Sequence, residues 1–162
     1  MKKINCLLLA LLLSATLFAQ TSFKLKVTGE AGSPLQLTLQ DIAAMPHTTA
    51  TLNDKDGKPH SYGGVPLSVI LSKAGVATGK ELRGKNLSKY LLVKCADGYE
   101  VLFSLAELDS SFTDKKIILA DSIDGAPLAE NRGPLRIVAE GEKKHARSCF
   151  QVLELIAGDG KD

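Results

Sequence analysis

Residues 47–76 read HTTATLNDKDGKPHSYGGVPLSVILSKAGV, and this stretch decides the class of fold. An extended run at 47–52 is followed by the turn residues Asp54-Lys55-Asp56-Gly57 and by a second extended run at 58–62. Gly57 can take the positive φ angle that a tight turn needs. The pattern therefore predicts a β-hairpin.

The second half of the stretch predicts a change from strand to helix. We expect Gly63-Gly64 to break the strand and Pro66 to occupy the first helical position. An apolar stripe at helical spacing follows, made by Leu67, Ile70, Leu71 and Ala74. Gly75 is then placed to end the helix.

Short strands dominate the rest of the chain. Apolar alternation and turn residues predict strands at 23–28, 35–39, 90–96, 99–103, 116–121, 135–139 and 150–156. Two capping-box patterns, Thr38 to Asp41 and Ser104 to Glu107, each predict the start of a short helix, the first of which ends near Ala44. Residues 79–89 are expected to form a polar, basic loop. Mixed strands and short helices indicate an α+β fold with mixed β-sheets.

The first 19 residues have the pattern of a secretory signal peptide. Lys2 and Lys3 precede a short apolar run, and small residues follow up to Ala19. We expect cleavage after Ala19, a periplasmic or secreted protein, and one domain over residues 20–162. An uncleaved membrane anchor is the alternative. No Arg-Arg pair precedes the apolar run, which favours export as an unfolded chain.

Charge and composition exclude several classes of function. Loss of Lys2 and Lys3 lowers the Lys+Arg count from 20 to 18, which equals the 18 Asp+Glu. The mature chain then has no net charge to attract nucleic acid or anionic lipid. Trp is absent and aromatics are 5%, which argues against a stacking platform for nucleic acid. We expect no nucleic-acid partner and no membrane span after signal removal.

The acids and histidines show no clean catalytic pattern. Four aspartates, at positions 54, 56, 121 and 124, lie at predicted turns or strand ends, where turn chemistry and a solvated face are typical. The histidines at 47, 60 and 145 have no metal-binding spacing, although the fold can bring two together. Cys95 and Cys149 both lie in apolar segments, so a disulfide and two buried thiols both remain open.

One segment concentrates positive charge. Residues 131–147 contain Arg132, Arg136, Lys143, Lys144 and Arg147, interrupted by glycines and a proline. Such a segment can hold a phosphate or carboxylate through arginine forks and backbone N–H groups. The alternative is a solvated loop whose charge is balanced by nearby glutamates.

Several fragments, taken together and in order, resemble one family. They are Tyr62-Gly63-Gly64-Val65-Pro66-Leu67, then Ala96-Asp97-Gly98-Tyr99 with Phe103-Ser104-Leu105-Ala106-Glu107-Leu108, then Gly133-Pro134-Leu135-Arg136-Ile137-Val138. This set is similar to the oxidoreductase molybdopterin-binding domain, which has the sulfite-oxidase fold. The likeness extends over roughly 23–156.

The resemblance implies a pterin carrying molybdenum, a cysteine thiolate on the metal, and basic residues on the pterin phosphate. Arg136 matches the arginine of the Pro-Leu-Arg motif, and Lys143, Lys144 and Arg147 lie in the corresponding loop. The ligating cysteine belongs on the strand at 47–52, which has none. Neither Cys95 nor Cys149 matches that position.

Two functions from different classes follow. The first is a module that has lost the molybdenum thiolate and binds a small anionic ligand or a periplasmic redox partner protein. The second is a genuine small molybdopterin-dependent oxidoreductase acting on a small periplasmic substrate, with Cys95 or a non-protein ligand on the metal. A third reading makes residues 79–89 a docking face through Lys80, Arg83, Lys85 and Lys89.

Overall fold

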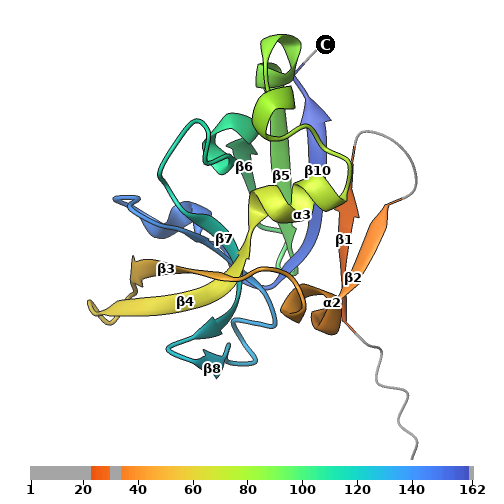
Figure 1. Cartoon of the computed structure of the whole chain (residues 1–162). Coiled ribbons are helices and arrows are strands. Elements are labelled where there is room, and N and C mark those ends of the chain that lie inside the picture. The colour runs from red at the N-terminus through yellow and green to blue at the C-terminus, as the bar shows by residue number, and fades with distance from the viewer. Residues whose placement is uncertain (1–22, 30–33, 161–162) are drawn as a thin grey trace, which may run out of the picture.

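The computed structural model describes residues 23–29 and 34–160, and within these ranges the strands form two sheets (Figure 1). Sheet A has the strand order β2-β1-β10-β5-β6. Its members are β2 (Leu35–Thr38), β1 (Lys24–Thr28), β10 (Val152–Asp159), β5 (Lys89–Cys95) and β6 (Glu100–Ser104). β1 and β10 run parallel, and the other neighbours are antiparallel.

Sheet B is antiparallel and contains the predicted hairpin. Its order is β3-β4-β7-β8, and β9 also pairs with β7. The strands are β3 (Thr48–Asn53), β4 (Pro59–Pro66), β7 (Ile117–Ile123), β8 (Ala126–Pro127) and β9 (Arg136–Ala139). Ala50 faces Tyr62 across the hairpin, and Ala120 faces Arg136 across β7 and β9.

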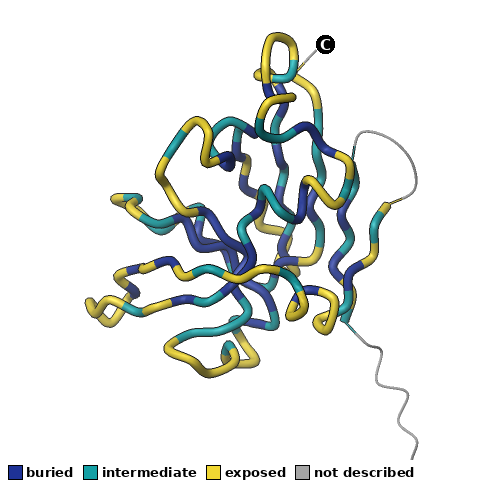
Figure 2. Tube along the Cα trace, viewed as in Figure 1, coloured by how far each residue is buried: buried dark blue, intermediate teal, exposed yellow. Residues whose placement is uncertain are grey.

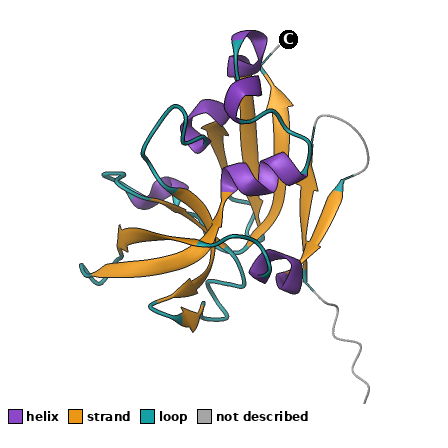
Figure 3. Ribbon diagram, in the orientation of Figure 1, coloured by secondary structure: helices purple, strands orange, loops and turns teal. Residues whose placement is uncertain are grey.

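The helices are short (Figure 3). They are α2 (Leu39–Ala43), α3 (Leu67–Lys73) and the 3-10 helices η1 (Gly79–Glu81), η2 (Gly84–Ser88), η3 (Leu105–Leu108) and η4 (His145–Arg147). Both predicted capping boxes form, at Thr38 for α2 and at Ser104 for η3. The prediction of an α+β fold with mixed sheets and short helices is confirmed.

The core lies where α3 packs against both sheets. Leu67, Ile70 and Leu71 of α3 are buried with residues of sheet A such as Leu91 and of sheet B such as Leu119. Figure 2 shows this buried zone along the strands, with exposure concentrated at the turns. A smaller apolar cluster contains Ala50, Leu52, Tyr62, Ile118, Ala120 and Val138, all from sheet B.

The predicted break at Gly63-Gly64 is wrong. β4 continues through both glycines to Pro66, with a register shift against β7 between them. A Cβ on Gly64 would lie 2.3 Å from the carbonyl oxygen of Leu119, so the missing side chain is what lets β7 approach. Pro66 is therefore the last residue of the strand, and α3 begins one residue later.

Two further boundaries differ from expectation. Residues 79–89 contain η1 and η2 before Lys89 opens β5, and Lys89 is buried, which removes it from any docking face. β10 starts at Val152, while Phe150 makes an isolated bridge to Arg136.

The predicted signal peptide at 1–19 lies outside the described residues. In the part of the chain that the structure describes, no helix is long and apolar enough to cross a membrane.

Candidate functional site

The β3–β4 hairpin carries an acid into the protein. Along β3 the buried positions alternate, and Ala50 and Leu52 are followed by Asp54 on the same inward face. The turn is closed by the N–H of Gly57, which donates to the carbonyl of Asp54 at 2.9 Å. Asp54 is 8% exposed, so the expectation of a solvated turn residue is wrong for this position.

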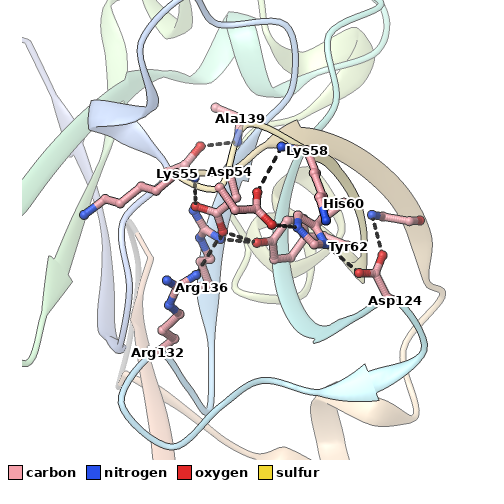
Figure 4. A network of polar contacts seen from close by, with 12 residues as sticks. Asp54, Lys55, Lys58, His60, Tyr62, Asp124, Arg132, Arg136 and Ala139 are labelled. Atoms are coloured by element: carbon pink, nitrogen blue, oxygen red, sulfur yellow. Dashed lines mark hydrogen bonds and ion pairs between the residues drawn. The ribbon is translucent and has the colours of Figure 1, made fainter.

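Asp54 is the centre of a buried ion-pair network, defined by Asp54, Tyr62, Arg132 and Arg136 (Figure 4). Its Oδ2 accepts from the Tyr62 hydroxyl at 2.8 Å, from Arg132 Nη1 at 2.9 Å and from Arg136 Nη1 at 3.2 Å. Arg136 also donates to the Tyr62 hydroxyl. Arg136 is 2% exposed, whereas the Arg132 side chain is 41% exposed. One arginine is thus fully enclosed, and the other reaches the surface.

The arginines of this network also lie over aromatic rings. The Arg136 guanidinium carbon is 4.1 Å from the centre of the Phe150 ring and 4.8 Å from that of Tyr62. Arg132 lies 5.4 Å from the same Phe150 ring. Guanidinium–ring contacts of this kind add to the attraction of the ion pair and suit Arg better than Lys.

The network fixes the charge on Asp54. Burial opposes ionisation, but the backbone N–H of Lys55, the hydroxyl of Tyr62 and the guanidinium of Arg136 outweigh it. Together they hold the pKa of Asp54 well below its ordinary value of 3.8. Burial and the bond to Asp54 raise the pKa of Tyr62 to about 12. The carboxylate is therefore ionised, and the phenol protonated, throughout the neutral range.

A hollow of about 350 Å³ lies next to the network. It is lined by Lys55, Asp97, Tyr99, His145, Ala146, Ser148, Cys149 and Phe150. Three segments distant in sequence contribute: the β3–β4 turn, the β5–β6 turn, and the chain from η4 to Phe150. The volume falls within the range of roughly 300–1,000 Å³ typical of small-molecule sites. Phe150 is shared, since its ring also faces the buried ion-pair network.

Around the hollow, Tyr99 and Asp97 are hydrogen-bonded within the protein, whereas Lys55 makes no ion pair among the described residues. The Tyr99 hydroxyl donates to the carbonyl of Ala146 at 3.0 Å, which joins the β5–β6 turn to η4. The Asp97 carboxylate accepts from the Tyr99 N–H at 2.9 Å. Lys55 is exposed, and its ammonium makes no ion pair within residues 23–29 and 34–160. The hollow therefore offers a free cation and one acid already hydrogen-bonded.

The structure separates the predicted site residues. Arg136 lies inside the buried ion-pair network and does not line the hollow. Arg147 pairs with Glu107 at 3.1 Å and with Glu142, and lies over the Phe103 ring. Lys143 and Lys144 are exposed and directly precede η4, and neither lines the hollow.

Sequence patterns did not identify four residues of this region as site residues: Asp54, Tyr62, Lys55 and Tyr99. A signal for Asp54 exists, because its position continues the inward alternation of Ala50 and Leu52. Its partners give no such signal, since Arg136 lies far along the chain and reaches Asp54 only through the pairing of β9 with β7. Tyr99 reaches Ala146 in the same way, across a long gap in sequence.

The residues present do not fit a thiolate-bound metal. β3 has no cysteine, and its end presents Asp54, whose Oδ2 is already held by Tyr62 and two arginines. Cys95 and Cys149 are free thiols, and both are buried in the core. Among the described residues, no group of three or more His, Cys, Asp or Glu side chains is arranged so that it could hold a metal ion.

A second charged cluster joins the hairpin to β7. His60 Nδ1 lies 2.6 Å from Asp124 Oδ2, and its Nε2 lies 3.0 Å from Asp56 Oδ2. Both carboxylates accept from the ring only when both nitrogens carry protons, so the bonds to Asp124 and Asp56 raise the pKa of His60. This cluster fastens two turns together at the surface.

Comparison with known proteins supports the fold. No family model matches the chain, and neither does any curated protein. Among solved structures, the chain is similar to the sulfane dehydrogenase SoxCD from Paracoccus pantotrophus, with a TM-score of 0.63 and 24% identity over 86% of this chain. The match spans 38% of the SoxCD chain. The described residues therefore have a sulfite-oxidase-like α+β fold.

Proposed function

We propose that this chain is an exported binding module of the sulfite-oxidase-like fold, which takes a small anionic ligand in the hollow beside the buried ion-pair network. One observation carries the proposal. Lys55 lines the hollow without an ion pair in the described part of the chain, whereas Arg132, Arg136 and Arg147 are all held by carboxylates. Export is supported by the pattern of residues 1–19.

The ligand chemistry follows from the groups around the hollow. Lys55 lines the hollow and attracts an anion, Lys143 and Lys144 add positive charge just before the lining residue His145, and the backbone at the two turns offers polar groups for its orientation. Asp97 is the acid of the lining, and its carboxylate accepts from the Tyr99 N–H. A phosphate, sulfate or carboxylate group fits this chemistry better than a cation.

Titration calorimetry with inorganic phosphate and with sulfate tests the proposal. Lys55→Gln should weaken binding, because it removes the cation that lines the hollow and keeps the length of the side chain. Lys144→Gln should weaken binding less, because Lys144 precedes the lining residue His145 and does not itself line the hollow. Lys80→Gln is the matched control, since Lys80 is equally exposed on η1 and does not line the hollow. Equal binding by all three variants and the parent contradicts the proposal.

The alternative is a molybdopterin-dependent oxidoreductase, favoured by the likeness to a sulfane dehydrogenase. The fold alone does not carry that activity, because function depends on the site. Elemental analysis for molybdenum, with pterin fluorescence, on protein from its native host separates the two. One equivalent of each overturns the binding-module proposal. A preparation that contains neither molybdenum nor pterin supports the binding-module proposal.

A further inference from the structure

Sheet A packs on the core with one face only. Along β5 the buried residues alternate with partly exposed ones, so that Leu91 and Val93 enter the main apolar cluster and Leu92 between them points the other way. Among the described residues, neither apolar cluster includes Leu92, Leu102 or Ile156. Leu102 is 53% exposed. The second face of the sheet, called here the outer face of sheet A, therefore presents apolar side chains that the core does not use.

The strand register arranges this outer face in rows. One row takes a charged residue from each of four strands, and in the order β1, β10, β5, β6 this charged row is Lys26, Glu154, Lys94 and Glu100. Two positions along the strands lies an apolar row, which in the same order is Thr28, Ile156, Leu92 and Leu102. The sign of the charge thus alternates from strand to strand.

Within one chain the charges of this row are paired side by side. Lys26 Nζ lies 2.6 Å from Glu154 Oε1, and Lys94 Nζ lies 2.9 Å from Glu100 Oε1. The side chains stay accessible, with 44% of Lys26 and 40% of Lys94 exposed. The row is therefore neutral as a whole, and its four charges can still face charges on another molecule.

The order of the signs makes the charged row complementary to a second copy of itself. Two sheets that pack face to face keep their strands nearly aligned. A two-fold axis parallel to the strands, between β10 and β5, sets β1 against β6 of the second copy and β10 against its β5. Every lysine of the row then faces a glutamate. The same axis sets Leu92 against Ile156 of the second copy.

The other in-plane two-fold axis is disfavoured by the same charges. An axis that runs across the strands along the charged row would set each residue of the row against its own copy. Four pairs of like charges would then meet, and like charges across an interface are strongly unfavourable. The charged row therefore selects one arrangement of two copies as well as permitting it.

We propose that the outer face of sheet A is the interface of a homodimer, aligned by the charged row and closed by the apolar row. The four strands span about 15 Å at the usual strand spacing. Such a contact lies at the small end of specific interfaces, where association is weak and transient. The dimer therefore forms in a concentration-dependent manner, and added salt weakens it by screening the ion pairs.

Sedimentation velocity from micromolar to millimolar concentration tests the proposal on protein produced from the full-length sequence and purified as the host exports it. The parent should pass from one chain to two as its concentration rises, and salt should move this transition to higher concentration. Lys94→Glu and Glu154→Lys should each remain monomeric where the parent is dimeric. Residue 94 faces residue 154 of the second copy, so either change brings like charges together twice.

An equimolar mixture of the two variants separates this interface from any other. In a mixed dimer of Lys94→Glu with Glu154→Lys, every facing pair of the charged row is again opposite in sign, so dimers should reappear. Lys80→Glu is the control, because Lys80 is exposed on η1, outside sheet A, and should dimerise like the parent.

Circular dichroism checks that each variant is folded. If a charge variant does not fold, Leu92→Gln replaces it and should move the transition to higher concentration, because it removes the apolar contact with Ile156 of the second copy. A parent that stays monomeric at millimolar concentration overturns the proposal. Folded charge variants that dimerise like the parent, or a mixture of them that stays monomeric, overturn it as well.

Discussion

Replacing Arg136 with Met tests the buried ion-pair network directly. Methionine keeps an unbranched stem against the Phe150 ring but removes the guanidinium that reaches Asp54 at 3.2 Å. Breaking a buried ion pair by removing one partner costs about 3–5 kcal/mol. Here Arg132 and the Tyr62 hydroxyl still hold the Asp54 carboxylate, at 2.9 Å and 2.8 Å, so we expect the lower end, about 3 kcal/mol.

The pH dependence identifies the cause of that loss. The pKa of Asp54 is lowered by folding, so its contribution to stability is complete above the unfolded value of about 4 and is lost as the pH falls below it. The difference in stability between the parent and Arg136→Met should therefore be largest at neutral pH and should narrow in acid. Urea unfolding followed by circular dichroism at neutral pH and near pH 3 measures both values.

A matched arginine provides the control. Arg147 pairs with two carboxylates, where Arg136 pairs with one, but the Arg147 side chain is 33% exposed. Such pairs contribute about 1 kcal/mol or less, so Arg147→Met should have a small effect. The reasoning is refuted if Arg136→Met unfolds at the same urea concentration as the parent. It is also refuted if the loss is the same at both pH values, because the ion pair would then not be its source.

Two further predictions concern other parts of sheet B. Gly64→Ala should destabilise the protein by about 1–3 kcal/mol, measured by thermal unfolding, because the new Cβ meets the carbonyl oxygen of Leu119. An unchanged thermal unfolding midpoint would contradict this prediction, because it would mean that β7 moves away from the new Cβ at no cost in stability. His60 has a raised pKa between Asp124 and Asp56, so its stabilising effect is complete below the ordinary value of 6.5 and is lost as the pH rises through the folded value. His60→Gln should flatten this dependence in unfolding measurements between pH 5 and 8, and a parent without the dependence would contradict the prediction.

Local patterns predicted the elements of this fold well. The hairpin turn, both capping boxes and the buried stripe of α3 follow from neighbours within a few positions, and each appears in the structure. The predicted strand break at Gly63-Gly64 did not appear. Glycine is present there because β7, more than fifty positions away in sequence, approaches the backbone of β4 too closely for a side chain at Gly64. Sequence spacing contains no information about that approach.

The site was harder to predict for the same reason. The basic segment was recognised as a cluster in sequence, but the fold divides it between the core and the surface. Arg136 enters the core on β9, Arg147 turns to its two glutamates, and Lys143 and Lys144 stay in solvent. The clustering of basic residues in the sequence therefore identified the region. The role of each basic side chain depends on which carboxylates the fold places beside it.

Phe150 connects the two parts of the site and affects how a binding experiment is interpreted. Its ring faces Arg136 in the buried ion-pair network, and the same residue lines the hollow next to Cys149. Removing Arg136 frees that ring and can alter the hollow without any contact between Arg136 and the ligand. A loss of anion binding in an Arg136 variant consequently fits a positioning role as well as direct contact. Lys55 lines the hollow from an exposed turn outside the core, so weaker binding by Lys55→Gln at unchanged stability assigns the contact.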